Sequence, residues 1–98
     1  MAVTIVFAAP PVNINASFAD GPWVYRLEIV DAKGTHINTL YDQQVVLEKN
    51  IWITWDGTND EGRLMGVGNY IARLSKNGVL IEKIALTWII PNASQSKP

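Results

Sequence analysis

The chain lacks several features that would assign it to a functional class. Its 98 residues contain no cysteine, which excludes disulfide bonds and thiolate metal sites but leaves the cellular compartment open. The net charge is only -1, so the sequence has no electrostatic footprint for nucleic acid or an anionic membrane. No apolar run approaches the roughly 20 residues of a membrane span. We therefore expect neither a nucleic-acid partner nor a membrane span.

The sequence also lacks the motifs of an enzyme. His36 is the single histidine, and no serine–histidine–aspartate set with a supporting local motif is present. No phosphate-binding glycine loop precedes a helix pattern, and no metal-ligand spacing occurs. With no cysteine or second histidine beside it, His36 is interpreted as a surface residue. We expect a non-catalytic protein without a cofactor.

What the sequence does contain is a regular succession of strand patterns. Short runs alternate between apolar and polar residues, turn residues interrupt them about every ten residues, and no useful helical periodicity appears. The apolar run at residues 2–9 has no basic segment before it, so it is interpreted as a strand and no signal peptide is visible. The pattern predicts one all-β domain at residues 1–90 and a flexible tail at residues 91–98. We expect strands at residues 3–8, 12–18, 23–30, 35–41, 45–55, 69–75 and 79–90, with Tyr25, Leu27 and Ile29 on one face of the third. Residues 31–34 and 77–78 are expected to form the turns of two hairpins.

The last predicted strand is apolar on both of its faces. A strand that exposes one face to water alternates more cleanly. One series is expected to point inward, namely Leu80, Ile84, Leu86, Trp88 and Ile90. The opposite series is also largely apolar, with Val79, Ile81, Ala85 and Ile89. Either another part of the same molecule or a partner is expected to cover that second face.

Four tryptophans are many for a chain of this length. Trp55 and Trp88 fall on the apolar faces of their strands and are expected in the core, whereas Trp52 faces the other way, toward solvent. Exposed aromatic residues mark protein interfaces more often than sugar-stacking platforms, so a protein contact is favoured. An apolar first strand can also donate its edge to a neighbour. The candidate contact residues are Trp52, Ala85, Thr87 and Ile89, or Val3, Ile5 and Phe7.

Residues 55–74 are the stretch richest in turn chemistry. Asp56, Asp60 and Glu61 offer carboxylates suited to calcium. An EF-hand loop that began at Asp56 would need glycine at its sixth position, but Gly62 is the seventh, so the EF-hand spacing fails. A structural role as a loop that positions strands is therefore favoured. The residues expected to serve it are Trp55, Asp56, Gly57, Asp60, Gly62, Gly68 and Tyr70.

A family pattern covers the chain from Trp23 to Ile90. It comprises residues 25–34 (YRLEIVDAKG), 37–40 (INTL), 55–57 (WDG), 60–62 (DEG) and 68–74 (GNYIARL). These motifs resemble the immunoglobulin-like domain of flagellar hook-capping proteins, a domain type also found as C-terminal modules of bacterial secreted and surface proteins. The resemblance implies an immunoglobulin- or fibronectin-III-like antiparallel β-sandwich of about seven strands, with a structural or attachment role.

These expectations lead to one main functional hypothesis. The chain is predicted to be a structural and protein-interaction module of a bacterial extracellular or envelope assembly, acting through apolar strand faces, edge pairing or self-association. Two alternatives stay open, a small glycan- or calcium-binding module and a virion decoration or tail protein.

Overall fold

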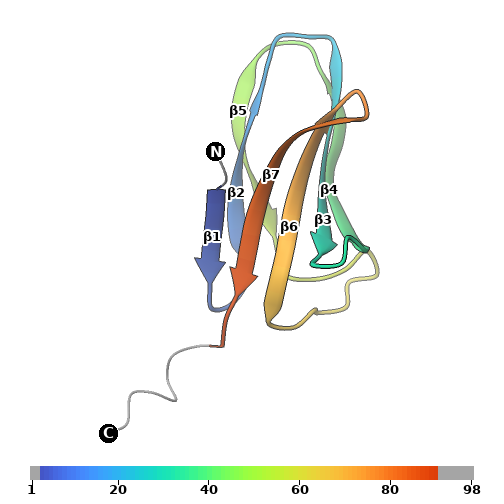
Figure 1. Ribbon diagram of the computed structural model, residues 1–98. Coiled ribbons are helices and arrows are strands. Elements are labelled where there is room, and N and C mark those ends of the chain that lie inside the picture. Colours follow the sequence, from blue (N-terminus) through green and yellow to red (C-terminus); the bar gives the residue numbers. More distant parts are fainter. Residues whose placement is uncertain (1–2, 91–98) are drawn as a thin grey trace, which may run out of the picture.

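The computed structural model describes residues 3–90, which form two β-sheets packed face to face (Figure 1). The strands are β1 (Val3–Phe7), β2 (Val12–Phe18), β3 (Trp23–Asp31), β4 (His36–Val45), β5 (Lys49–Trp55), β6 (Gly68–Lys76) and β7 (Val79–Trp88). The predicted all-β class is confirmed. The predicted tail at residues 91–98 lies outside the described residues.

The two sheets differ in size. The larger has the order β1-β7-β6-β3-β4, and the smaller pairs only β2 with β5. Two hairpins, β3–β4 and β6–β7, lie within the larger sheet, while the connections after β1, β2, β4 and β5 cross between sheets. Crossings of this kind stack the apolar faces of the two sheets and leave the outer faces on opposite sides of the molecule.

The core follows the period-two pattern of the strands. On β2 every second residue is buried, and β3, β6 and β7 each supply a similar inward series. Trp55, Tyr25 and Leu27 are among the largest fully buried side chains. The core cluster is formed by Val12, Ile14, Ala16, Phe18, Tyr25, Leu27, Ile29, Val45, Ile53, Trp55, Tyr70, Ala72, Leu74, Ile84, Leu86 and Trp88.

The predicted hairpin turns occur at the expected positions. In the β3–β4 turn, the Gly34 N–H donates to the Asp31 carbonyl at 3.0 Å, and the Asp31 carboxylate accepts from the Lys33 and Thr35 N–H groups. Asn77 and Gly78 both have positive φ, 50° and 82°, between β6 and β7. Two positive φ values give the type I′ turn that matches the twist of paired strands.

The expectation of a wholly antiparallel sandwich is wrong at one place. β1 pairs with β7 in parallel, from Val3 opposite Ile84 to Phe7 opposite Trp88, and every other pairing is antiparallel. Parallel pairing is possible here because no hairpin joins the two strands: the chain leaves β1 for the opposite sheet and reaches β7 only after five further strands. In Figure 1 the β1 and β7 arrows point the same way.

The prediction that Leu80 and Ile90 point inward is also wrong. A bulge pairs Leu74 with Glu82 but Ser75 with Leu80, so one residue of β7 has no partner and Leu80 moves to the outer face. Leu80 is 39% exposed. Ile90 lies beyond the end of β7 and is exposed. A single bulge inverts the alternation on which the prediction relied.

One strand boundary differs from its prediction in the middle of the chain. β4 extends to Val45, which is buried and pairs with Trp23, and β5 begins only at Lys49. The predicted strand at 45–55 therefore contains the end of one strand, a short connection and the next strand.

Candidate functional site

The connection between β5 and β6, residues 56–67, is held in shape by its own side chains. The Asp56 Oδ1 atom accepts hydrogen bonds from the Thr58 hydroxyl at 2.5 Å and the Thr58 N–H at 3.1 Å. These bonds, the hydroxyl first, lower the pKa of Asp56. Asn59 Oδ1 accepts from the N–H groups of Glu61 at 2.9 Å and Arg63 at 3.0 Å. The polar residues therefore organise the loop backbone.

Gly57 lies where this loop meets the core. Its φ is 84°, and a Cβ atom there would lie 2.9 Å from Pro10 Cγ and 3.2 Å from Trp88 Cη2. Its carbonyl accepts the Met65 N–H at 2.8 Å, which closes the loop across its base. Both the backbone conformation and the close approach require glycine.

Two core aromatic residues fasten the loop to the sandwich. The Trp55 indole Nε1 donates to the Thr58 carbonyl at 2.8 Å, and the Tyr70 hydroxyl donates to the Gly66 carbonyl at 2.7 Å. The two rings meet edge to face with centroids 5.1 Å apart. Each end of the loop is thus tied to a core residue of the strand it adjoins.

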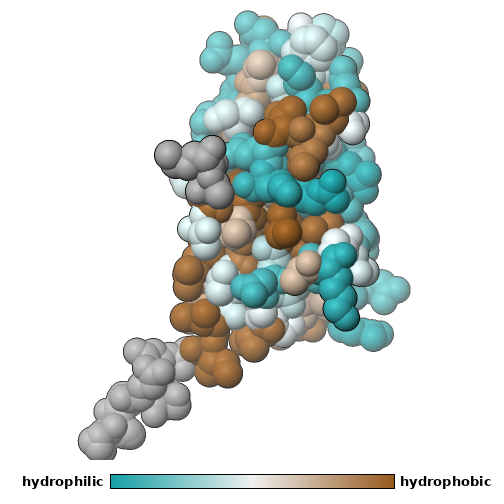
Figure 2. All heavy atoms as spheres, in the orientation of Figure 1, coloured by the Kyte–Doolittle hydropathy of each residue, from teal (hydrophilic) through white to brown (hydrophobic). Residues whose placement is uncertain are grey.

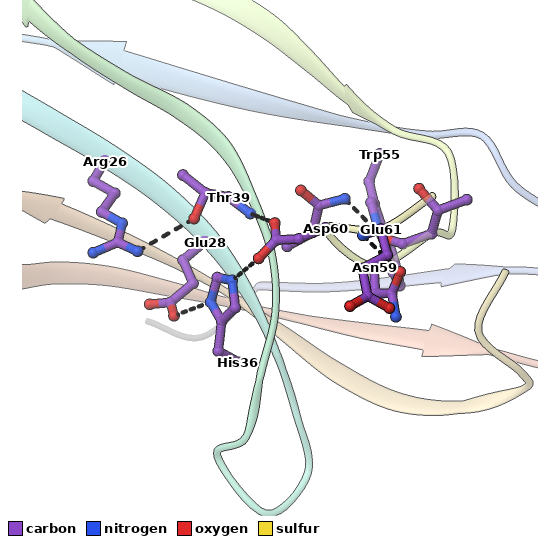
Figure 3. A network of polar contacts seen from close by, with 10 residues as sticks. Arg26, Glu28, His36, Thr39, Trp55, Asn59, Asp60 and Glu61 are labelled. Carbon is purple, nitrogen blue, oxygen red and sulfur yellow. Dashed lines mark hydrogen bonds and ion pairs between the residues drawn. The ribbon is translucent and has the colours of Figure 1, made fainter. Parts of the chain in front are cut away.

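His36 bridges the loop and the larger sheet (Figure 3). Its Nδ1 lies 2.6 Å from Glu28 Oε2 on β3, and its Nε2 lies 2.5 Å from Asp60 Oδ2 in the loop. Asp60 Oδ1 also accepts the Thr39 N–H at 3.1 Å, and the Asp60 N–H donates to the Ile37 carbonyl at 3.0 Å. These contacts hold the loop against β4.

The bridge favours the charged form of the histidine. The hydrogen bond to Glu28, followed by that to Asp60, raises the pKa of His36, and the same contact with His36 is the main cause of the lowered pKa of Asp60. His36 lies at the surface, as the sequence predicted, but its pairing was missed. Asp60 is 24 residues further along the chain, and no local pattern indicates that contact.

The loop carboxylates do not converge on a common point. Asp56 binds Thr58, and Asp60 binds His36 and Thr39. Within residues 3–90, no group of three or more histidine, cysteine, aspartate or glutamate side chains is arranged to hold a metal ion. This geometry gives no support to the calcium alternative.

The outer face of the larger sheet carries a shallow hollow of about 360 Å³. Its charged lining residues are Arg26, Glu28, Asp42 and Arg73, so opposite charges lie side by side there. The uncharged lining residues are Val24, Ser75, Gly78 and Leu80. With two cationic and two anionic groups, this hollow has no excess of one sign with which to select a charged ligand.

Two of the three first-strand contact candidates, Ile5 and Phe7, point into the molecule, whereas Val3 is 43% exposed. Val3, Ile5 and Phe7 pair with the inward-facing residues of β7, and Ile5 and Phe7 pack against the core. The Phe7 ring stacks on Trp88 with centroids 5.6 Å apart. The large apolar residue of β1 that is most exposed is instead Val6, at 60%. A partner would meet this strand at its edge or through Val6, and not through Ile5 or Phe7.

The remaining contact candidates divide between the two outer faces. Ala85 and Thr87 lie on the outer face of the larger sheet, opposite Thr4 and Val6 of β1, and Ile89 follows them with its N–H bonded to the Phe7 carbonyl. Trp52 lies on the outer face of the smaller sheet and is 69% exposed. The structure therefore does not bring Trp52 and Ala85 into one surface.

Around Trp52 the smaller sheet presents a compact set of uncharged polar side chains, which we call the Trp52 face. Three cross-strand pairs form it, namely Asn13 with Thr54, Asn15 with Trp52, and Ser17 with Asn50. Asn15 Nδ2 donates to Asn50 Oδ1 at 2.5 Å, Asn50 Nδ2 donates to the Ser17 hydroxyl at 2.7 Å, and the Thr54 hydroxyl donates to Asn13 Oδ1 at 2.7 Å. The sequence indicated that Trp52 is exposed, but which residues surround it depends on the pairing of β2 with β5.

Residues 3–90 contain no helix with the length and apolarity needed to cross a bilayer. Comparison of the chain with protein-family models, with curated proteins and with solved structures gives no match.

Proposed function

We propose that this chain is a non-catalytic structural module that binds a protein partner in a bacterial extracellular or envelope assembly. The observation that carries the proposal is β1, whose sequence VTIVF has no charge and no proline and which forms one edge of the larger sheet. Natural proteins protect such edges with lysine, proline, bulges or covering segments. An apolar edge without lysine or proline is suited to pairing with a strand from another chain.

Exposed apolar side chains continue from this edge onto the neighbouring surface. Val6 projects from β1, and Ile89 and Ile90 follow the end of β7 beside it. Figure 2 shows apolar atoms along the lower part of β1 and the end of β7, and a second group over the β6–β7 hairpin. A partner strand added at β1 would gain main-chain hydrogen bonds from the edge and apolar contacts from these residues.

The strand order supports an immunoglobulin- or fibronectin-III-like type within the β-sandwich class. In that type, Greek-key connections link the two sheets. The hydroxyl of a tyrosine near the start of the sixth strand donates a hydrogen bond to the backbone a few residues upstream. Tyr70 on β6 makes this bond to the Gly66 carbonyl. Two residues later, Ala72 stands where antibody domains have a disulfide cysteine. These features agree with the resemblance carried by residues 25–34 and 55–74.

Self-association offers the first test. Sedimentation velocity over a rising concentration series is expected to show reversible association of the unmodified chain, and Val6→Lys is expected to weaken it because edge lysines oppose strand pairing. Leu64→Lys, on the exposed β5–β6 loop, is the matched control and is expected to behave as the parent.

A hetero-partner is tested with a photo-crosslinking residue at position 6, compared with one at position 64, in the organism that makes the protein. The proposal predicts a discrete adduct only at position 6. A strictly monomeric chain together with no adduct at position 6 above that at position 64 would overturn it.

A further inference from the structure

The Trp52 face belongs to the smaller sheet, whereas the β1 edge belongs to the larger one. Its composition is unusual for an exposed sheet face, since none of its six residues is charged and only one, Trp52, is apolar. The sole aromatic ring occupies the middle pair, with an asparagine opposite and a pair of polar residues on either side along the strands. We propose that this face binds a neutral carbohydrate, with one sugar ring stacked on Trp52.

The aromatic ring supplies the apolar part of such a site. A pyranose has an apolar face of C–H groups, which carry a slight positive charge and are attracted to the negative face of an aromatic ring. Trp52 is 69% exposed, so its ring is accessible without rearrangement of the fold. Its strand neighbours Ile51 and Ile53 point inward and fix the backbone that carries it. An exposed aromatic ring on a strand is a suitable platform for the apolar face of a sugar.

The polar residues supply the hydrogen bonds that sugar hydroxyls need. An asparagine amide has two N–H donors and an oxygen with two acceptor sites, so the cross-strand bonds of Asn13, Asn15 and Asn50 use only part of their capacity. Those same bonds hold the amides in place before any ligand arrives. Preorganised donors and acceptors lower the entropy lost on binding.

The size and charge of the face favour this ligand over a protein. From Asn13 to Ser17 the strand rises by about 13 Å, enough for a short oligosaccharide. Protein interfaces have a largely apolar buried centre, enriched in aromatic residues, methionine and arginine. Here Trp52 stands alone among amides and hydroxyls. A ligand that presents hydroxyl groups around a small apolar patch is the better complement.

The test uses the intact chain and a panel of neutral oligosaccharides, namely cellohexaose, chitohexaose, laminarihexaose and mannohexaose. Isothermal titration calorimetry is expected to show binding of at least one of them. Trp52→Ala is expected to weaken that binding by roughly two- to tenfold, the size of effect that loss of an aromatic stacking contact produces. Asn15→Ala should weaken it less, and Trp52→Phe should retain part of it.

Two controls distinguish a sugar site at Trp52 from nonspecific adhesion of sugar to exposed apolar or charged groups. Leu47→Ala removes an apolar side chain as exposed as Trp52 but outside the face, and is expected to leave sugar binding unchanged. Because the face is uncharged, affinity should not fall as salt rises. Melting temperatures of all variants, expected to stay near the parent value, show that each is folded.

No heat of binding with any sugar of the panel would overturn the proposal, as would binding that Trp52→Ala leaves intact. If Trp52→Ala instead abolishes self-association, the face is a protein interface and the carbohydrate assignment is wrong. Val6→Lys is expected to leave sugar binding unaffected, so the outcome here is independent of the β1 edge.

Discussion

The hydrogen bond from Tyr70 to Gly66 gives the sharpest prediction for stability. Tyr70 is buried at the start of β6, and its hydroxyl donates at 2.7 Å to a carbonyl in the loop, where Gly66 itself is exposed. Tyr70→Phe keeps the ring and its contact with Trp55 but removes the donor. Because Gly66 is exposed, the variant is expected to lose the net value of one hydrogen bond, about 1 kcal/mol, and not the larger penalty of an unpaired buried group.

For a domain of this size, about 1 kcal/mol corresponds to a fall in melting temperature of roughly 4 to 8 °C. Circular dichroism melts, combined with urea unfolding, measure both quantities. Tyr41→Phe is the matched control, since its ring stacks on Phe18 and its hydroxyl makes no hydrogen bond within residues 3–90. Equal melting temperatures for Tyr70→Phe and the parent would refute the view that this bond secures the loop.

Two further predictions concern the loop. Gly57→Ala is expected to lower the free energy of unfolding by about 2 to 4 kcal/mol, because it adds a clash with Pro10 to the cost of positive φ. Gly62→Ala, with φ 80° and no atom within 4 Å of its Cβ, should lower it by only about 1 to 2 kcal/mol. Urea unfolding measures both variants, and equal losses would contradict the close approach at Gly57. The raised pKa of His36 means that the bridge stabilises fully below its ordinary value of 6.5 and that this contribution is lost as pH rises through the higher folded pKa. Between about pH 6 and pH 8 the melting temperature should therefore fall more for the parent than for His36→Gln. If the two plots of melting temperature against pH ran parallel, the His36 bridge would not be the source of the pH dependence.

Local patterns in the sequence were sufficient for most of the fold. The alternation at residues 23–30 predicted the buried series Tyr25, Leu27 and Ile29, because a half-buried strand imposes a period of two. Asn77–Gly78 predicted its hairpin because few residues tolerate two positive φ values. The prediction failed at Leu80, since a bulge adds one residue to one strand and no local signal marks it.

The candidate sites depended much more on contacts between distant parts of the chain. Exposure of Trp52 could be predicted because its neighbours Ile51 and Ile53 take the inward positions. That Asn15 lies opposite Trp52 could not be predicted, because it requires the pairing of β2 with β5 across more than thirty intervening residues. The same limit applies to His36, whose two carboxylate partners come from β3 and from the β5–β6 loop.

By itself, the sequence determined that this is an all-β chain, that Trp55 and Trp88 lie in its core, and where its tight turns lie. These properties follow from side-chain period and from the φ values that glycine and asparagine permit, both of which act over a few residues. Only the tertiary structure decided that β1 lies parallel to β7, that Trp52 and Ala85 face opposite sides, and that uncharged amides surround Trp52. Sheet order and strand register fix these relations, and both depend on which strands meet in space and not on the residues beside them in the chain.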